Sequence, residues 1–87
     1  MSIIGGDEGE LAMLKVSFDR QAGMLQELTT TLRGQLANTN WQGPSAERFR
    51  AAWAEEYERV LNRLEQALLE AGMEVGRARE RLIQAGS

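Results

Sequence analysis

Two long runs of regularly spaced apolar residues, separated by one short break, constrain the fold of this chain more than any other feature. The first run advances by three or four residues at a time. It consists of Leu11, Leu14, Phe18, Ala22, Leu25, Leu28, Leu32 and Leu36. This spacing places the side chains on one face of an α-helix. The sequence therefore predicts a helix from about residue 7 to about residue 38, and Asp7 with Glu10 resembles a capping pair at its start.

The second run has the same spacing and predicts a helix from about residue 45 to about residue 82. It consists of Ala46, Phe49, Trp53, Tyr57, Val60, Leu64, Ala67, Ala71, Val75, Ala78 and Leu82, and it is widened by Leu61, Leu68 and Met73. Glycines interrupt both predicted helices, each at a cost of about 1 kcal/mol relative to alanine. In the first helix, Gly23 and Gly34 either lie on the solvated face or permit close approach of another backbone.

Residues 38–44 form the only strong break between the two helices. Asparagine and glycine favour turns there, and Pro44 cannot continue a helix but suits the first position of a new one. Either Gly43 or Ser45 can serve as the N-cap. So short a connection favours antiparallel packing. The chain of 87 residues is therefore predicted to be one all-α domain over residues 1–87, a helix-turn-helix hairpin with its turn at 39–44.

A two-helix hairpin of this kind is expected to need a partner. Two helices touch along one line, so each leaves part of its apolar stripe in water, and a large exposed apolar surface marks an interaction site. Two hairpins packed at about 20° would form a four-helix bundle. The alternative is a monomeric hairpin that flanking charges keep soluble. The residues expected in the core or dimer interface are Leu14, Phe18, Leu25, Leu28, Leu32, Phe49, Trp53, Tyr57, Val60, Leu64 and Leu68.

Four of the five aromatic residues lie close together, between Trp41 and Tyr57. Trp41 falls in the turn itself. Gly43, two residues later, allows a backbone conformation or a close approach that a Cβ would block. The aromatic cluster is either the packed end of a core or, at Trp41, also a contact for a partner, because tryptophan is a common interface hot spot.

The segment Trp41-Gln42-Gly43 resembles the Trp-x-Gly motif of the WXG family, the small early-secreted-antigen (ESAT)-like proteins that type VII secretion systems export. The chain length, the single hairpin and the central motif match that family, and Ala46, Phe49 and Trp53 resemble the positions that follow its motif. The resemblance implies a homodimer, or a heterodimer with a related WXG-type protein. It also implies export from the cytoplasm in the folded state without a cleaved signal peptide.

The same resemblance implies recognition by a membrane-bound FtsK-type ATPase through a signal split between two protomers. One part is the turn with Trp41 and Gly43, and the other is the partner's C-terminal tail, which usually carries Tyr-x-x-x-Asp/Glu. This chain departs from that tail pattern, because Tyr57 lies in mid-helix and Gly76 stands four residues before Glu80. The simplest expectation is a different protomer that brings the tail signal.

The composition offers little catalytic chemistry. The chain has no histidine and no cysteine, which removes the commonest acid–base group and the commonest strong nucleophile. No glycine-rich phosphate loop or EF-hand pattern is present. We therefore expect no enzymatic activity, no cofactor and no metal.

Charge and hydropathy limit the possible partners. A net charge of −3 argues against nucleic acid, and no apolar run approaches the roughly 18 residues that a membrane span needs. The start of the chain, residues 1–8, lacks the pattern of a signal peptide. Near the other end, Arg77, Arg79 and Arg81 either complement a helix C-terminus or form a site for an anionic partner.

The leading functional hypothesis is a type VII secretion substrate or co-secreted partner. One alternative is a cytosolic adaptor hairpin that covers the helical end of a larger secreted effector or toxin. Another is a plain coiled-coil dimerisation module without a role in export. All three share a fold, so the apolar periodicity does not separate them.

Overall fold

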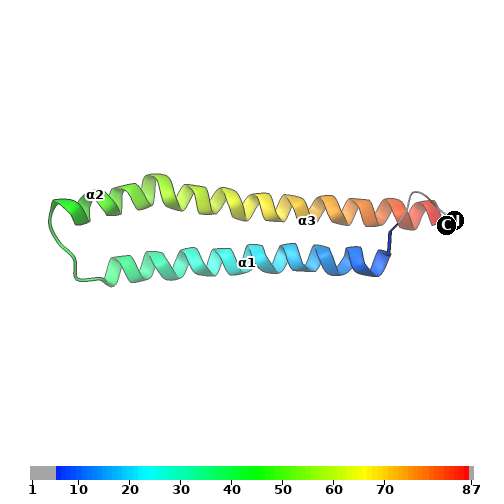
Figure 1. Cartoon of the computed structure of the whole chain (residues 1–87), viewed down its shortest axis with the longest axis horizontal. Coiled ribbons are helices and arrows are strands. Elements are labelled where there is room, and N and C mark those ends of the chain that lie inside the picture. The colour runs from blue at the N-terminus through cyan, green and yellow to red at the C-terminus, as the bar shows by residue number, and fades with distance from the viewer. Residues whose placement is uncertain (1–5, 87) are drawn as a thin grey trace.

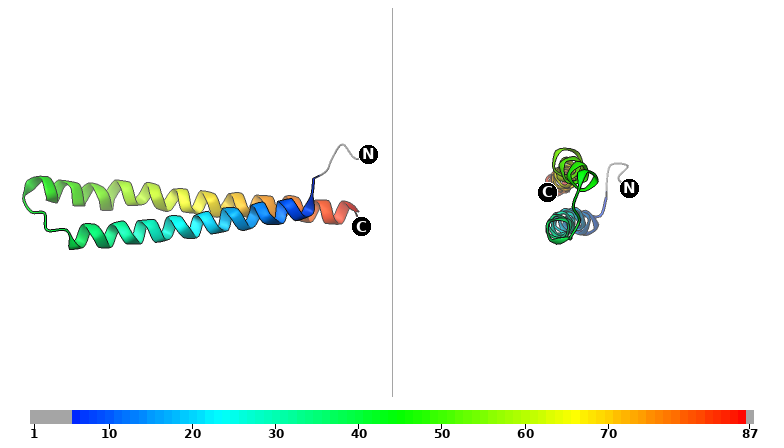
Figure 2. Two further views of the ribbon diagram at one scale, coloured as in Figure 1. Left: turned by 60° about the horizontal axis from the view of Figure 1, so that its bottom comes forward. Right: turned by 90° about the vertical axis from the view of Figure 1, so that its left-hand side faces the viewer.

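Residues 6–86, which the computed structural model describes, form an all-helical hairpin (Figure 1). Helix α1 spans Glu8–Asn38. The returning helix consists of α2 (Pro44–Ala52), a π-helical turn η1 (Trp53–Tyr57) and α3 (Glu58–Gly86). The hairpin measures 66 × 17 × 16 Å. Both views in Figure 2 show the two helices side by side and antiparallel, as the short connection predicted. Residues 1–5, which carry part of the signal-peptide prediction, lie outside the described residues.

Local capping explains where the helices begin. At the start of α1, the Asp7 carboxylate accepts a hydrogen bond of 3.1 Å from the backbone N–H of Glu10, which satisfies one of the N–H groups that have no partner inside the helix. Gly43 is the N-cap of α2 and has a φ of 106°. An added Cβ on Gly43 would meet nothing within 4 Å. The backbone conformation, and not close approach, therefore requires glycine at this position.

The end of α3 lies further along the chain than the apolar spacing predicted. The helix continues to Gly86 instead of stopping near Leu82. Arg77, Arg79 and Arg81 consequently lie before the last turn, where the helix dipole acts only weakly. Arg77 pairs with Glu74 at 2.9 Å, and Arg79 donates to the backbone oxygen of Glu8 at 3.2 Å. The helix-dipole explanation is therefore weakened, and a site for an anionic partner stays a prediction.

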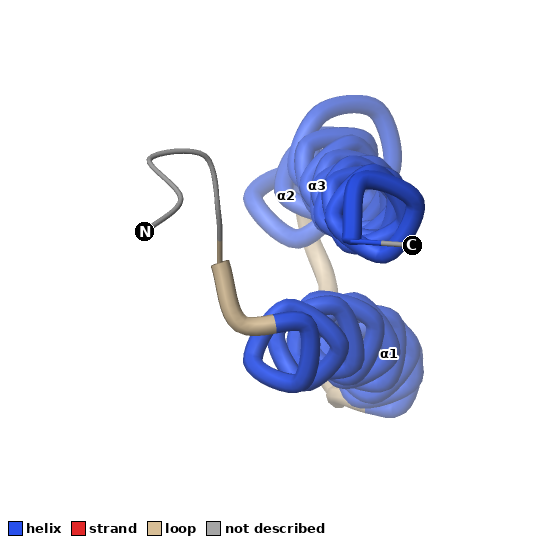
Figure 3. The backbone as a smooth tube through the Cα atoms, turned by 90° about the vertical axis from the view of Figure 1, so that its right-hand side faces the viewer, coloured by secondary structure: helices blue, strands red, loops and turns tan. Residues whose placement is uncertain are grey.

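Small residues form the seam between the two helices. Ala22, Thr29 and Ala46 are buried, and no large side chain among the described residues is fully buried. Gly72 is also buried. A Cβ added to Gly72 would lie 2.9 Å from the Asp19 carboxylate and 3.3 Å from the Cβ of Phe18, so this glycine permits close approach of the helices. Viewed along its length, the hairpin is one layer of two helices, and nothing else in residues 6–86 covers either side (Figure 3).

The glycines of α1 behave differently from Gly72. A Cβ added to Gly23 or Gly34 would meet nothing within 4 Å. Both positions are exposed. Within the hairpin they fit the solvated-face interpretation and not the close-approach alternative.

The π-helical turn changes which residues of the second helix face α1. The backbone N–H of Glu58 bonds to the oxygen of Trp53, five residues earlier. This turn therefore holds one residue more than an α-helical turn, and the residues after it are rotated by about 100°. Before the turn, Ala46 is buried, whereas after it Val60 and Leu64 are exposed. The single continuous face that the spacing predicted from Ala46 to Leu82 is thus interrupted at Tyr57.

Candidate protein interface

One side of the hairpin carries an apolar groove in which leucines of both helices meet. Three hollows lie along it, with volumes of about 150, 350 and 370 Å³. The first two share Gln21 and Leu68, and the third lies at the turn end. We define the apolar groove by the large apolar residues that line these hollows: Leu14, Phe18, Met24, Leu25, Leu28, Leu32, Leu36, Phe49, Trp53, Leu64 and Leu68.

Nine of the eleven residues expected in a core or interface line the apolar groove; Tyr57 and Val60 do not. Phe18, Leu25, Trp53 and Leu68 are half-buried. The other seven are exposed, and they are Leu14, Leu28, Leu32, Phe49, Tyr57, Val60 and Leu64. The hairpin alone therefore leaves most of its predicted interface in water.

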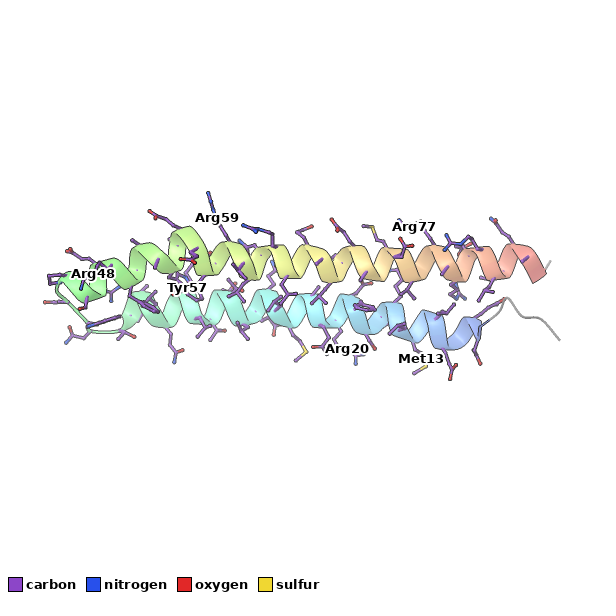
Figure 4. All side chains as sticks on the ribbon, turned by 45° about the horizontal axis from the view of Figure 1, so that its top comes forward. Met13, Arg20, Arg48, Tyr57, Arg59 and Arg77 are labelled. Carbon is purple, nitrogen blue, oxygen red and sulfur yellow. The ribbon has the colours of Figure 1, made fainter. Side chains whose placement is uncertain are left out.

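The opposite side of the seam carries charged residues beside smaller apolar ones, and a hollow of about 560 Å³ there is lined by Ala12, Lys15, Val16, Met73, Gly76, Arg77, Arg79 and Glu80. Lys15 and Arg33 each follow a groove leucine by one residue, which turns them about 100° away from the groove. Lys15 pairs with Asp19 at 2.7 Å, and the Nε of Arg33 donates to the Glu58 carboxylate at 2.9 Å. Figure 4 shows other charged residues, among them Arg20 and Arg59, pointing outward from the hairpin. The groove is thus lined mainly by leucines and aromatic residues, whereas the opposite side mixes apolar and charged residues.

The contact between Arg33 and Glu58 joins α1 to the start of α3. Hydrogen bonding to Arg33 lowers the pKa of Glu58, and the same bond raises the pKa of Arg33. The Trp53 indole also contributes to lowering the pKa of Glu58, although the buried Nε1 of Trp53 makes no hydrogen bond of normal geometry within residues 6–86. Both charges are therefore favoured in the folded hairpin.

Three aromatic rings form a row from the turn to η1. The ring centroids of Trp41 and Phe49 are 5.6 Å apart, and those of Phe49 and Tyr57 are 6.2 Å apart. Tilted aromatic pairs at such distances attract one another. Trp41 is nevertheless 39% exposed. The structure thus shows that Trp41 packs on Phe49, whereas a contact between its exposed part and a partner stays a prediction.

Arg50 holds the turn together, a role that the sequence does not reveal. Its guanidinium donates to the backbone oxygens of Trp41, Thr39 and Leu36 at 2.7, 3.0 and 3.3 Å. It also lies 5.9 Å from the centroid of the Trp41 ring, within the range of a cation–π contact. The sequence shows Arg50 in a mixed-charge segment near Arg48, whose guanidinium makes a long hydrogen bond of 3.4 Å to the Ser45 hydroxyl. Nothing in the pattern separates the two arginines.

Comparison with models of known protein families, with curated proteins and with solved structures finds no match for this chain. Within residues 6–86, no three acidic side chains gather closely enough to hold a metal ion. No described helix combines the length and the apolar character that crossing a membrane requires.

Proposed function

We propose that this chain is a non-enzymatic assembly partner of a type VII secretion system. It pairs through the apolar groove with a second helical hairpin, either another copy or a related chain, and forms a four-helix bundle that is exported folded. The observation that carries the proposal is the lack of a closed core in residues 6–86, together with seven exposed large apolar residues at positions that the sequence assigns to an interface.

The size of the hairpin face fits such pairing. A face of 66 by 17 Å projects about 1,100 Å², and a stable protein–protein interface buries about 800 Å² on each partner. Covering the groove would remove Leu28, Leu32 and Leu64 from water, at about 25 cal/mol for each Å² of apolar surface. The stability of the hairpin is therefore coupled to that of the assembly.

The geometry of the turn supports the export part of the proposal. Gly43 adopts a positive φ directly before α2, and Arg50 holds the backbone of Trp41. The half-exposed Trp41 ring is consequently presented in one orientation and not on a loose loop. A fixed, exposed tryptophan suits recognition by another protein.

Isolation of the native complex, with mass determination, tests this function. We expect a complex of at least two hairpin chains, of which this one contributes 9.7 kDa, and the same complex in the culture supernatant. Deletion of the secretion ATPase should remove it from the supernatant while leaving it in the cells. Recovery only from the cytosol, bound to a larger effector, would instead support an adaptor.

A further inference from the structure

The apolar stripe of the second helix could face α1 throughout if that helix were a continuous α-helix. Its members recur every three or four residues from Ala46 to Leu82 without a gap at the π-helical turn. In the structure the stripe leaves the seam in the first turns of α3 and is half-buried again at Ala71, Val75, Ala78 and Leu82. Ala46 is 0% exposed, whereas Val60 and Leu64 are 53% and 48% exposed. One sequence thus contains two possible registers for residues 58–86.

The register in the structure places a carboxylate and a glycine of α3 in the seam and two leucines of α3 in the groove. Leu61 and Glu65 are half-buried and Gly72 is buried, so the inward positions of α3 include a carboxylate and a glycine. Leu64 and Leu68, by contrast, line a groove hollow with Leu25 and Leu28 of α1. Leu64 and Leu68 are therefore directed to the groove, where a second chain can cover them.

We propose that the π-helical turn Trp53–Tyr57 is the register element of this hairpin. By rotating α3, it turns Leu64 out of the seam and into the apolar groove beside Leu68, where a second copy of this chain binds. This inference rests on the proposed function only for the existence of pairing. A second copy fits because two identical grooves, placed face to face, satisfy each other, and because the projected face is as large as a stable dimer needs.

The alternative register has a definite cost for assembly. In a continuous α-helix the residues after Tyr57 turn back by about 100°, so that Ala71 takes the place of Gly72 beside Phe18. Leu64 then faces α1. The groove loses the leucines that α3 contributes, and the surface for the second copy is no longer continuous.

Disulfide trapping distinguishes the two registers, because the chain has no native cysteine. A Cβ on residue 72 would lie 3.3 Å from that of Phe18, close to the separation in a disulfide. The pair Phe18→Cys with Gly72→Cys should therefore oxidise readily, both in the dilute chain and in the associated one. The matched pair Phe18→Cys with Ala71→Cys should oxidise poorly. Preferential cross-linking of the Ala71 pair would overturn the proposal.

A deletion tests whether assembly uses the same register. Removing Ala54 converts the π-helical turn into an ordinary α-turn and preserves the faces on both sides of it. We expect this variant to self-associate with a dissociation constant within about tenfold of that of the unchanged chain. Deletion of Ala67, an exposed alanine in the regular part of α3, rotates the residues after it and should weaken association by more than that.

The outcomes of the two experiments separate the register from the pairing. If the unchanged chain associates and the Ala54 deletion abolishes association, the dimer uses the continuous helix and the proposal is wrong. If the unchanged chain remains a stable monomer at every concentration, the second copy is excluded as the occupant of the groove, and with it this proposal of a register for self-assembly. The disulfide result would then still report which register the hairpin adopts, and the proposed function would depend on a related chain.

Discussion

Arg50 and the two tryptophans show how single side chains divide structural and binding roles at the turn. Arg50 bonds a carbonyl near the end of α1, Leu36, and two carbonyls in the turn. Trp53 lines the hollow at the turn end. Trp41 packs on the Phe49 ring, lies near the Arg50 guanidinium and is 39% exposed. We therefore expect substitution of Arg50 or Trp53 to lower the stability of the fold. Substitution of Trp41 should mainly weaken binding to another protein.

Substitution of the two tryptophans separates these roles. A fully buried tryptophan costs about 3–5 kcal/mol when it is truncated to alanine, so the half-buried Trp53 should approach the lower part of that range. Trp41→Ala should lower the melting temperature less than Trp53→Ala and should reduce secretion more than it reduces folding. Thermal unfolding and supernatant abundance measure the two effects. Equal destabilisation by both variants would make Trp41 a core residue.

Substitution of Arg50 should loosen the turn without removing apolar surface from the groove. A buried hydrogen bond to a charged group contributes about 1.5–3 kcal/mol; because two of the three bonds of Arg50 are exposed, Arg50→Ala should destabilise by about the amount of one such bond. Arg48→Ala is the matched control, with an effect within about 0.5 kcal/mol. Chemical denaturation compares them. Identical midpoints for the two variants would show that the three carbonyl contacts do not hold the turn.

At the scale of helices, the sequence correctly predicted the features that depend on neighbouring residues, namely where the helices begin and where the turn lies. The spacing of leucines, the cap at Asp7 and the break before Pro44 are local signals, and the two helices lie where those signals place them. The π-helical turn could not be predicted, because the apolar spacing continues through it. The close approach of the helices at Gly72 could not be predicted either, because it is a tertiary contact that residue spacing does not reveal.

The ion pair between α1 and α3 predicts a dependence of hairpin stability on pH. The folded hairpin lowers the pKa of Glu58 below its ordinary value of 4.5, chiefly through Arg33. A lowered pKa stabilises the fold above the ordinary value, and the contribution disappears as pH falls through the lowered one. Melting temperatures should therefore drop below pH 4.5, and less so in Glu58→Gln. Glu55→Gln, which alters an exposed carboxylate in η1, serves as control; an unchanged acid response in Glu58→Gln would contradict this account.

The described part of the molecule is one layer of two helices, and most of its large apolar residues are exposed or half-buried. Most groove positions could be predicted from spacing alone, but not their division into seam and groove. That division depends on the rotation at the π-helical turn, which exposes Val60 and Leu64. The proposed pairing would therefore cover apolar surface that the folding of one hairpin leaves exposed.

A charge placed in the groove should act on pairing before it acts on the fold. Leu64 is 48% exposed in the single hairpin and would be covered in a pair, where an unpaired carboxylate is costly. Leu64→Asp should therefore abolish association while much of the helicity remains. Arg59→Asp, at a position that points outward (Figure 4), is the control and should leave association unchanged. Circular dichroism and sedimentation report the two properties; normal association of Leu64→Asp would exclude the groove as the interface.

The central claim is that the hairpin completes its core by pairing. Sedimentation of the unsubstituted chain over a wide micromolar range tests this claim most directly. The account predicts a mass of two 9.7 kDa chains, with helicity and melting temperature rising as the chains associate. A stable monomer with a sharp, cooperative transition that is independent of concentration would contradict it, because such a monomer would not need the apolar groove to be covered.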